Sequence, residues 1–158
     1  MQDITLSLDP SRLDIDAIHA FLTGSYWAAG IGRDVVARAV AGSVCIGAFH
    51  GHTQVGFARL VTDRATFAYL ADVYVLPEHR GRGIAVGMLD ALFADVQVQG
   101  LRRMLLATRD AHALYARYGF TPLAAPERMM EVHRPHVYRL PAEPSAAEGE
   151  RTNNTGDR

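Results

Sequence analysis

The chain has 158 residues, a formal net charge of −1 and 21% charged residues. This length suits one compact domain with a sizeable core, and the composition is typical of a globular protein. Because the total charge is small and no long run of Lys or Arg occurs, nothing indicates a nucleic-acid partner. No apolar stretch reaches the length of a membrane span, and the N-terminus lacks the pattern of a signal peptide. We therefore expect a soluble cytoplasmic protein that does not bind membranes.

The first third of the chain combines one short strand with two helices. Alternation of apolar and polar residues predicts an edge strand over residues 4–8. Apolar residues at helical spacing predict helices over residues 14–22 and 34–41. The glycine-punctuated loop between these helices carries two large aromatic residues, Tyr26 and Trp27.

Three strands are predicted next, over residues 44–49, 54–62 and 68–76. Short turns join them, which favours an antiparallel meander. The single cysteine, Cys45, lies in the first of these strands and excludes an intrachain disulfide. Because no neighbouring feature would activate the thiol, we interpret Cys45 as a small buried hydrophobic residue and not as a nucleophile.

A long helix is predicted over residues 83–97, with Ile84, Met88, Leu92 and Val96 on one face. After it we expect a strand over residues 103–107 and a helix over residues 111–118, which Gly119 terminates. Two further short strands are expected over residues 120–123 and 129–132. The remaining residues are polar, and we expect a disordered tail over residues 141–158. Residues 1–140 then form a single domain.

The turn over residues 80–85 connects the third strand of the meander to the long helix. The first backbone N–H groups of a helix lack carbonyl partners and, with the helix dipole, favour an anion. Gly81 and Gly83 lack Cβ atoms, so a phosphate can approach the backbone closely. Arg80 and Arg82 add charged donors. These features together predict an anion-binding turn.

The same glycines allow an alternative interpretation. Gly81, Gly83 and Gly87, with Asp110 downstream, also match a dinucleotide fingerprint, which would make the protein an NAD-binding oxidoreductase. We disfavour this interpretation because the turn follows an antiparallel meander instead of opening a βαβ unit. Too little chain also remains after Asp110 for the second half of that fold.

Two separated motifs in this order resemble the GCN5-related N-acetyltransferase superfamily. Residues 80–85 match its signature Arg/Gln-x-x-Gly-x-Gly/Ala, and residues 111–120 look like its segment Ala-x-x-Leu-Tyr-x-x-x-Gly-Phe. The resemblance covers residues 4–132. It implies an α/β (α+β) fold with a mixed, mostly antiparallel sheet, splayed central strands and helices on both faces.

The resemblance also implies acetyl-CoA as the acyl donor and no metal. The resemblance implies that the following residues hold acetyl-CoA: Val73, Tyr74, Val75, Arg80, Gly81, Arg82, Gly83, Ile84, Ala85, Thr108, Asp110 and His112. Thr108 is a departure, because the family often has Asn at that position.

Acetyl transfer to an amine benefits from a proton donor for the leaving thiolate. By resemblance, Tyr115 is the candidate general acid, although it could simply pack its helix against the sheet. Asp72 lies in a nearly all-apolar strand and is the candidate base. The alternative for this carboxylate is an ion pair with an arginine such as Arg59 or Arg109.

The acceptor pocket is predicted from the aromatic loop and from the beginning of the third meander strand, with Tyr26, Trp27, Asp63, Arg64, Thr66 and Tyr69. The aromatic pair could form an apolar wall or a cation-binding face, or Trp27 could anchor the loop on the core. We expect an N-acetyltransferase whose acceptor is the primary amine of a small molecule. The protein is expected to act as a monomer or homodimer. A non-catalytic acyl-CoA-binding module and an NAD-binding oxidoreductase are the alternatives.

Overall fold

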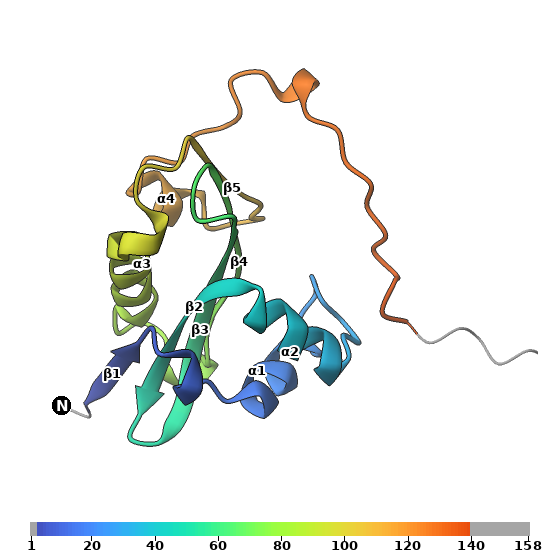
Figure 1. The fold of residues 1–158 in the computed structure, drawn as a ribbon. Coiled ribbons are helices and arrows are strands. Elements are labelled where there is room, and N and C mark those ends of the chain that lie inside the picture. Colours follow the sequence, from blue (N-terminus) through green and yellow to red (C-terminus); the bar gives the residue numbers. More distant parts are fainter. Residues whose placement is uncertain (1–2, 140–158) are drawn as a thin grey trace, which may run out of the picture.

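Five strands form one sheet in the computed structural model, which describes residues 3–139. They lie in the order β1-β2-β3-β4-β5 (Figure 1). The strands are β1 (Ile4–Ser7), β2 (Ser43–His50), β3 (Thr53–Thr62), β4 (Phe67–Val75) and β5 (Arg103–Leu106). The helices are α1 (Ile15–Leu22), α2 (Arg33–Ala41), α3 (Ile84–Ala94) and α4 (His112–Ala116), with short 3-10 turns η1 (Pro10–Arg12), η2 (Pro77–His79), η3 (Val96–Val98) and η4 (Pro126–Arg128).

The first four strands form the predicted antiparallel meander. The strand β5 joins the edge beside β4 in parallel orientation. A parallel pair needs a long crossover connection, and α3 provides it on one face of the sheet. The predicted mixed, mostly antiparallel sheet is therefore confirmed.

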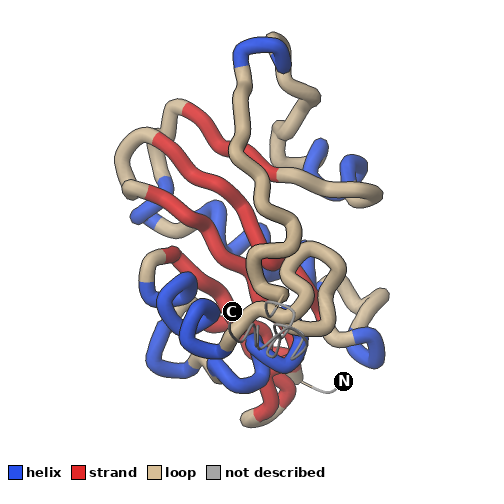
Figure 2. Tube along the Cα trace, turned by 90° about the vertical axis from the view of Figure 1, so that its right-hand side faces the viewer, coloured by secondary structure: helices blue, strands red, loops and turns tan. Residues whose placement is uncertain are grey.

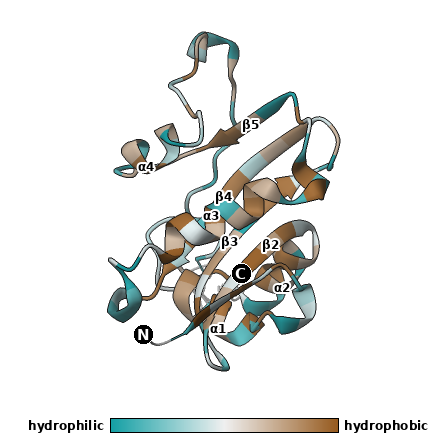
Figure 3. Cartoon of the chain, turned by 90° about the vertical axis from the view of Figure 1, so that its left-hand side faces the viewer, coloured by the Kyte–Doolittle hydropathy of each residue, from teal (hydrophilic) through white to brown (hydrophobic). Residues whose placement is uncertain are grey.

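Helices cover both faces of this sheet, as predicted, with α3 on one face and α1 and α2 on the other (Figure 1). On the α3 face, Met88 and Leu92 are fully buried in a cluster with Ile46 of β2. On the opposite face, Ile18 and Val36 pack with residues of β2, β3 and β4. Figure 3 shows the apolar residues along the strands between these two layers.

The strand β4 contains a bulge at Asp72. Ala71 pairs with Arg59 and Tyr74 pairs with Phe57, so β4 advances three residues while β3 advances two. Asp72 has a φ of 55°, in the left-handed region that Asp and Asn tolerate better than most residues. Because one extra residue reverses the alternation, Tyr74 faces the α1 and α2 layer.

The strands β4 and β5 separate after a short paired stretch. Residues 67–70 of β4 pair with residues 103–106 of β5. Beyond Leu70, β4 continues to Val75, whereas β5 ends at Leu106. This divergence is the predicted splay between the two strands.

The helix α3 ends at Ala94, three residues before the predicted end. The carboxylate of Asp95 accepts a hydrogen bond from the backbone N–H of Gln97 at 2.8 Å and starts the turn η3. The prediction that Val96 lies on the buried face was wrong, because the helix has already ended and Val96 is 84% exposed.

The two short strands predicted at residues 120–123 and 129–132 do not form. In the part of the chain that the structure describes, only the turn η4 follows α4. Pro122 and Pro126 lack the N–H donors that a strand ladder uses. Figure 2 shows the segment as a loop that descends in front of the sheet, and Met130 within it is 97% exposed. The predicted tail at residues 141–158 lies outside the described residues.

None of the helices within residues 3–139 has the length and apolar character needed to cross a membrane.

Cys45 lies on β2 beneath α2 and is buried, as predicted. Burial raises the pKa of its thiol to about 12, so the reactive thiolate is scarce at neutral pH. We expect a thiol reagent such as DTNB at pH 8 to react roughly a hundredfold more slowly with the folded protein than with the protein in guanidinium chloride. Equal rates in the two conditions would contradict the buried position.

Candidate active site

A cavity of about 240 Å³ lies where β4 and β5 separate. Its walls come from the end of β4, the turn after it, the first turn of α3 and the helix α4. The lining residues are Val73, Tyr74, Val75, His79, Arg80, Gly81, Gly83, Ile84, Ala85, Val86, Ala111, Leu114 and Tyr115. The structure thus brings most of the predicted cofactor-binding residues to one cavity, together with the candidate acid.

The glycine turn leaves open space beside its backbone. Gly81 has a φ of 72° and Gly83 a φ of 74°, and a Cβ atom added to either would meet nothing within 4 Å. Gly83 is the N-cap residue of α3 and provides no side-chain cap. The first N–H groups of α3 therefore have no partner within the helix and favour an anion at this place. The turn fits the diphosphate group of acetyl-CoA.

The two arginines of the turn have local contacts. Arg80 Nε donates to the carbonyl oxygen of Val75 at 2.9 Å, which holds the turn against the end of β4. Arg82 Nη1 lies 3.4 Å from His79 Nδ1. The arginines thus shape the turn and also place two positive charges beside the start of α3.

The end of β4 presents an unpaired edge to the cavity. Within residues 3–139, β4 pairs with β5 only as far as Leu70, so the backbone of Val73 and Tyr74 has no ladder partner on that side. Both residues line the cavity. An unpaired strand edge can bind an extended chain that carries amides, such as the pantetheine arm of acetyl-CoA.

Tyr115 lines the same cavity from α4 and is 9% exposed. Burial raises the pKa of its phenol, and Tyr26 and Asp110 raise it further. Among the described residues, its hydroxyl makes no hydrogen bond within the protein. Tyr118 differs, because its hydroxyl donates to Asp90 Oδ1 at 2.8 Å. The available hydroxyl is therefore that of Tyr115.

The residues that lead into α4 lie beside the cavity and do not line it. Thr108 Oγ1 accepts a hydrogen bond from the backbone N–H of Ala111 at 3.1 Å. Thr108, at the position where the family often has Asn, thus stabilises the approach to α4. Asp110 and His112 are exposed at the beginning of the helix.

Asp72 is engaged at both carboxylate oxygens. Its Oδ2 accepts from Arg59 Nε at 2.6 Å, and its Oδ1 accepts from Trp27 Nε1 at 2.9 Å. The side chains of Asp72 and Arg59 are only 10% and 18% exposed. The structure therefore shows the ion pair with Arg59 that the sequence left open. This arrangement favours a structural role for the carboxylate over that of a base.

Replacing Arg59 with methionine is expected to lower the free energy of unfolding by about 3–5 kcal/mol, because it leaves the carboxylate of Asp72 buried and unpaired. Urea denaturation would measure the change. The matched control is Arg33→Met, which breaks the exposed pair with Asp16 and should change stability little. Equal effects of the two substitutions would contradict the burial of the Asp72 pair.

The aromatic loop between α1 and α2 reaches the segment before α4. Trp27 and Tyr26 lie edge to face, with ring centroids 5.0 Å apart. The guanidinium carbon of Arg109 lies 3.8 Å from the centroid of the Tyr26 ring, which is a cation–π contact. Tyr26 and Arg109 thus connect the two loops that flank the splay.

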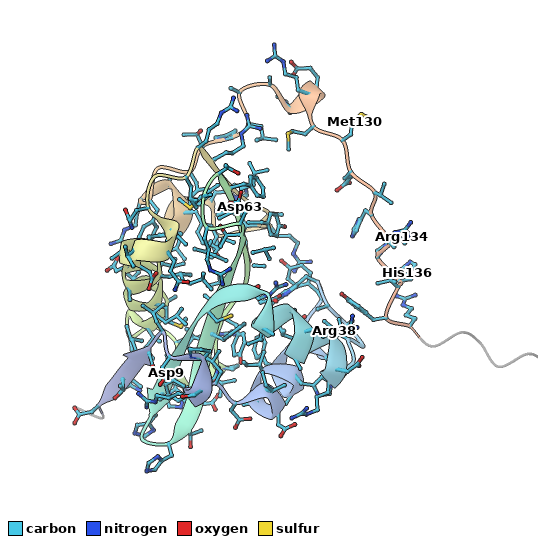
Figure 4. The ribbon with its side chains drawn as sticks, viewed as in Figure 1. Asp9, Arg38, Asp63, Met130, Arg134 and His136 are labelled. Atoms are coloured by element: carbon cyan, nitrogen blue, oxygen red, sulfur yellow. The ribbon has the colours of Figure 1, made fainter. Side chains whose placement is uncertain are left out.

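The structure does not bring Asp63, Thr66 and Tyr69 to the cavity. Asp63 lies at the turn before β4, at the sheet end near β5 (Figure 4), whereas the cavity lies at the end of β4 roughly 20 Å along the strand. Its carboxylate accepts from the hydroxyl of Thr66 at 2.6 Å and from three backbone N–H groups. The hydroxyl above all holds the pKa of Asp63 well below its usual range.

Asp63, Arg64 and Thr66 therefore belong to this turn and not to an acceptor wall. Tyr69 lies where β4 and β5 are still paired. Four further residues line the cavity and were not predicted as site residues from the sequence, namely His79, Val86, Ala111 and Leu114. Ala111 and Leu114 occupy fixed positions of the second motif, which was the available signal for them.

No cluster of three or more potential metal ligands occurs among residues 3–139.

An unpaired strand end, a glycine turn at a helix start and a buried tyrosine surround one cavity, an arrangement suited to holding an acyl-CoA. Comparison with known families agrees, because residues 41–122 match the model of the acetyltransferase (GNAT) domain. The chain belongs to the GNAT family of acetyltransferases. Its sheet does not have the parallel order of a dinucleotide-binding fold, so the oxidoreductase interpretation is not supported.

Individual relatives agree with this assignment. An acetyltransferase candidate of Gibberella zeae is 35% identical over 138 residues, covering 73% of this chain and 77% of the relative. A crystal structure from Xanthomonas campestris, described as a GNAT-family acetyltransferase candidate, is 50% identical with a TM-score of 0.85 and covers 89% of this chain and 99% of that one. A Clostridium acetobutylicum structure with acetyl-CoA has a TM-score of 0.60 at 20% identity, covers 84% and 96%, and supports the fold alone.

Proposed function

We propose that this protein is an N-acetyltransferase that moves the acetyl group of acetyl-CoA to the primary amine of a small molecule. One observation carries the proposal. The unpaired end of β4, the open glycine turn and the buried Tyr115 line a single cavity. These are the groups needed to hold an acyl-CoA and to provide a proton where its thioester would lie.

The chain provides different groups for different parts of acetyl-CoA. The backbone N–H groups that begin α3, with Arg80 and Arg82 nearby, hold the diphosphate. The backbone of Val73 and Tyr74 pairs with the amides of the pantetheine arm. When bound, acetyl-CoA supplies an activated acyl group as a thioester.

Tyr115 is the proposed general acid. Its hydroxyl makes no hydrogen bond within the described residues, and burial favours the protonated phenol. The proton on Oη is therefore available for the thiolate that leaves. We assign no base among the side chains, since Asp72 is bonded at both oxygens and the acceptor can lose its proton to solvent.

The raised pKa of Tyr115 predicts the alkaline side of the pH profile. An ordinary tyrosine loses its proton near pH 10, and the shift to higher pKa keeps the Tyr115 phenol protonated beyond that value. We therefore expect kcat to show no decline from loss of the acid between pH 7 and about pH 9.5. Initial rates measured across this range with a saturating amine test this, and a fall in kcat with a midpoint near pH 8 would contradict Tyr115 as the acid.

The proposed function is tested by thiol release from acetyl-CoA with a panel of primary amines. The panel should contain alkylamines, arylalkylamines, amino sugars, amino acids and a lysine-containing peptide. Turnover with a small amine is the expected result, and turnover only with the peptide would instead assign a protein acceptor. Folded protein that binds acetyl-CoA but transfers to none of these would favour the non-catalytic acyl-CoA-binding module.

A further inference from the structure

The carboxylate of Asp72 belongs to a set of hydrogen bonds next to Val73, which lines the cavity. It bonds Trp27 of the α1–α2 loop and Arg59 of β3, as the distances above show. Arg59 Nη1 also donates to Ser43 Oγ at 3.2 Å, and Ser43 Oγ donates to the carbonyl oxygen of Ala39 in α2 at 2.7 Å. A continuous set of hydrogen bonds therefore runs from the aromatic loop through β4, β3 and β2 to α2.

We propose that Asp72 is a positioning residue: its carboxylate, held by Arg59, fixes Trp27 and with it the α1–α2 loop. This loop reaches the cavity through Phe21 of α1, whose ring lies 6.2 Å from Trp27 and stacks at 3.8 Å on Tyr74 of the cavity lining. The role of the loop in holding the acceptor rests on the proposed function. The positioning itself does not, because it can be measured on the protein without any acceptor.

The bulge explains why a carboxylate occupies this place. Asp72 has positive φ and is the extra residue of β4, so it lies outside the regular alternation of the strand. A bulge can redirect a side chain, and here it turns the carboxylate to the α1 and α2 face of the sheet, where Arg59 and Trp27 lie. The ion pair with Arg59 holds one carboxylate oxygen of Asp72, so the other oxygen of Asp72 is a fixed acceptor for the indole N–H of Trp27.

The position of Trp27 determines that of Tyr26. The two rings are in edge-to-face contact, and Arg109 lies on the ring of Tyr26. Tyr26 also contributes to the raised pKa of the Tyr115 phenol, after burial. The bond between Asp72 and Trp27 thus bears on the position of Tyr26 and, through Arg109, on the segment before α4.

The substitution Asp72→Asn separates the two bonds of the carboxylate. An amide offers one acceptor oxygen and one donor NH₂, so it cannot accept from both neighbours. The charged donor Arg59 takes the oxygen, which leaves the indole N–H of Trp27 facing another donor. Asparagine also tolerates positive φ, so the bulge itself is retained.

Trp27 is the single tryptophan of the chain, so its fluorescence reports on this loop alone. In Asp72→Asn we expect a shifted emission maximum and a roughly twofold larger acrylamide quenching constant, because the loop opens more often. The matched control is Asp16→Asn, which removes the exposed pair with Arg33 between α1 and α2 and should leave the emission unchanged. Wild-type emission and quenching in a folded Asp72→Asn protein would overturn the proposal.

A second variant keeps the test decisive if Asp72→Asn does not fold. Trp27→Phe retains an aromatic ring and loses the N–H donor together with the five-membered ring of the indole. We expect the backbone amides of Ala28 and Gly30, which bond Ser25 Oγ and the carbonyl of Thr23, to exchange hydrogen about tenfold faster in this variant. Unchanged exchange at both amides would overturn the proposal.

Once an amine from the panel is found to be a substrate, steady-state kinetics of Asp72→Asn distinguish a positioning role of Asp72 from the role of a base. Positioning predicts that Asp72→Asn raises the KM for that amine about tenfold, with an unchanged KM for acetyl-CoA and an unchanged acidic limb of the pH profile. Loss of that acidic limb with an unchanged KM for the amine would make Asp72 the base and contradict the positioning role.

Discussion

Replacing Gly83 with valine is expected to weaken acetyl-CoA binding by roughly a hundredfold, as measured by calorimetry. Gly83 has a φ of 74°, where a β-branched residue is strained, and it precedes the first turn of α3. The protein itself leaves the space for the new side chain empty, because nothing lies within 4 Å of the Cβ position. The loss therefore comes from blocking the approach of the diphosphate to the backbone.

A matched control separates backbone strain from ligand exclusion. Gly100 has a φ of 71° and is equally open around its Cβ position, but it lies before β5 and does not line the cavity. Gly100→Val should therefore destabilise the protein to a similar degree and bind acetyl-CoA normally. If both variants bound acetyl-CoA as tightly as the wild type, the turn would not be the diphosphate site.

Removing the hydroxyl of Tyr115 should produce the largest loss of activity. We expect Tyr115→Phe to lower kcat by about 10²–10⁴-fold, because the leaving thiolate loses its proton donor. The dissociation constant for acetyl-CoA should change little, and so should the melting temperature, since the hydroxyl makes no hydrogen bond within the described residues. Steady-state kinetics, calorimetry and thermal denaturation measure these three quantities.

The control for this variant lies three residues further along the chain, just beyond the end of α4. Tyr118 donates its hydroxyl proton to Asp90, and burial together with Asp90 raises the pKa of its phenol to about 12. Tyr118→Phe should therefore lose about 1 kcal/mol of stability and retain its kcat. An unchanged kcat in Tyr115→Phe would remove this residue from the mechanism.

The sequence predicted the meander and the glycine turn because both depend on local patterns. The strands β2 and β3 are apolar runs that are buried along most of their length, and short turns restrict how consecutive strands pair. The turn at residues 80–85 needs glycine backbone conformations that few other residues adopt, so its composition carries the information.

The bulge at Asp72 could not be predicted from local pattern. Its existence depends on the register between β3 and β4, which brings Arg59 within reach of the carboxylate. The sequence could name Arg59 as a possible partner, because a buried carboxylate needs one. The bond from Trp27 requires the α1–α2 loop to fold back over β4, and no pattern in either segment indicates it.

Other differences arise where a local contact competes with periodicity. The apolar spacing of α3 continues to Val96, but the capping carboxylate of Asp95 ends the regular pattern earlier. At Asp63, a polar turn resembled an acceptor site, yet its hydrogen bonds are directed into the turn itself. The turn and the cavity lie at opposite ends of β4.

Calorimetric titration of the protein with acetyl-CoA and, separately, with NAD tests the central claim most directly. The glycine turn and the unpaired end of β4 predict binding of acetyl-CoA with a dissociation constant of roughly 1–100 μM and no binding of NAD. Folded protein that binds NAD but not acetyl-CoA, or that binds neither, would contradict the assignment of the cavity as an acetyl-CoA site.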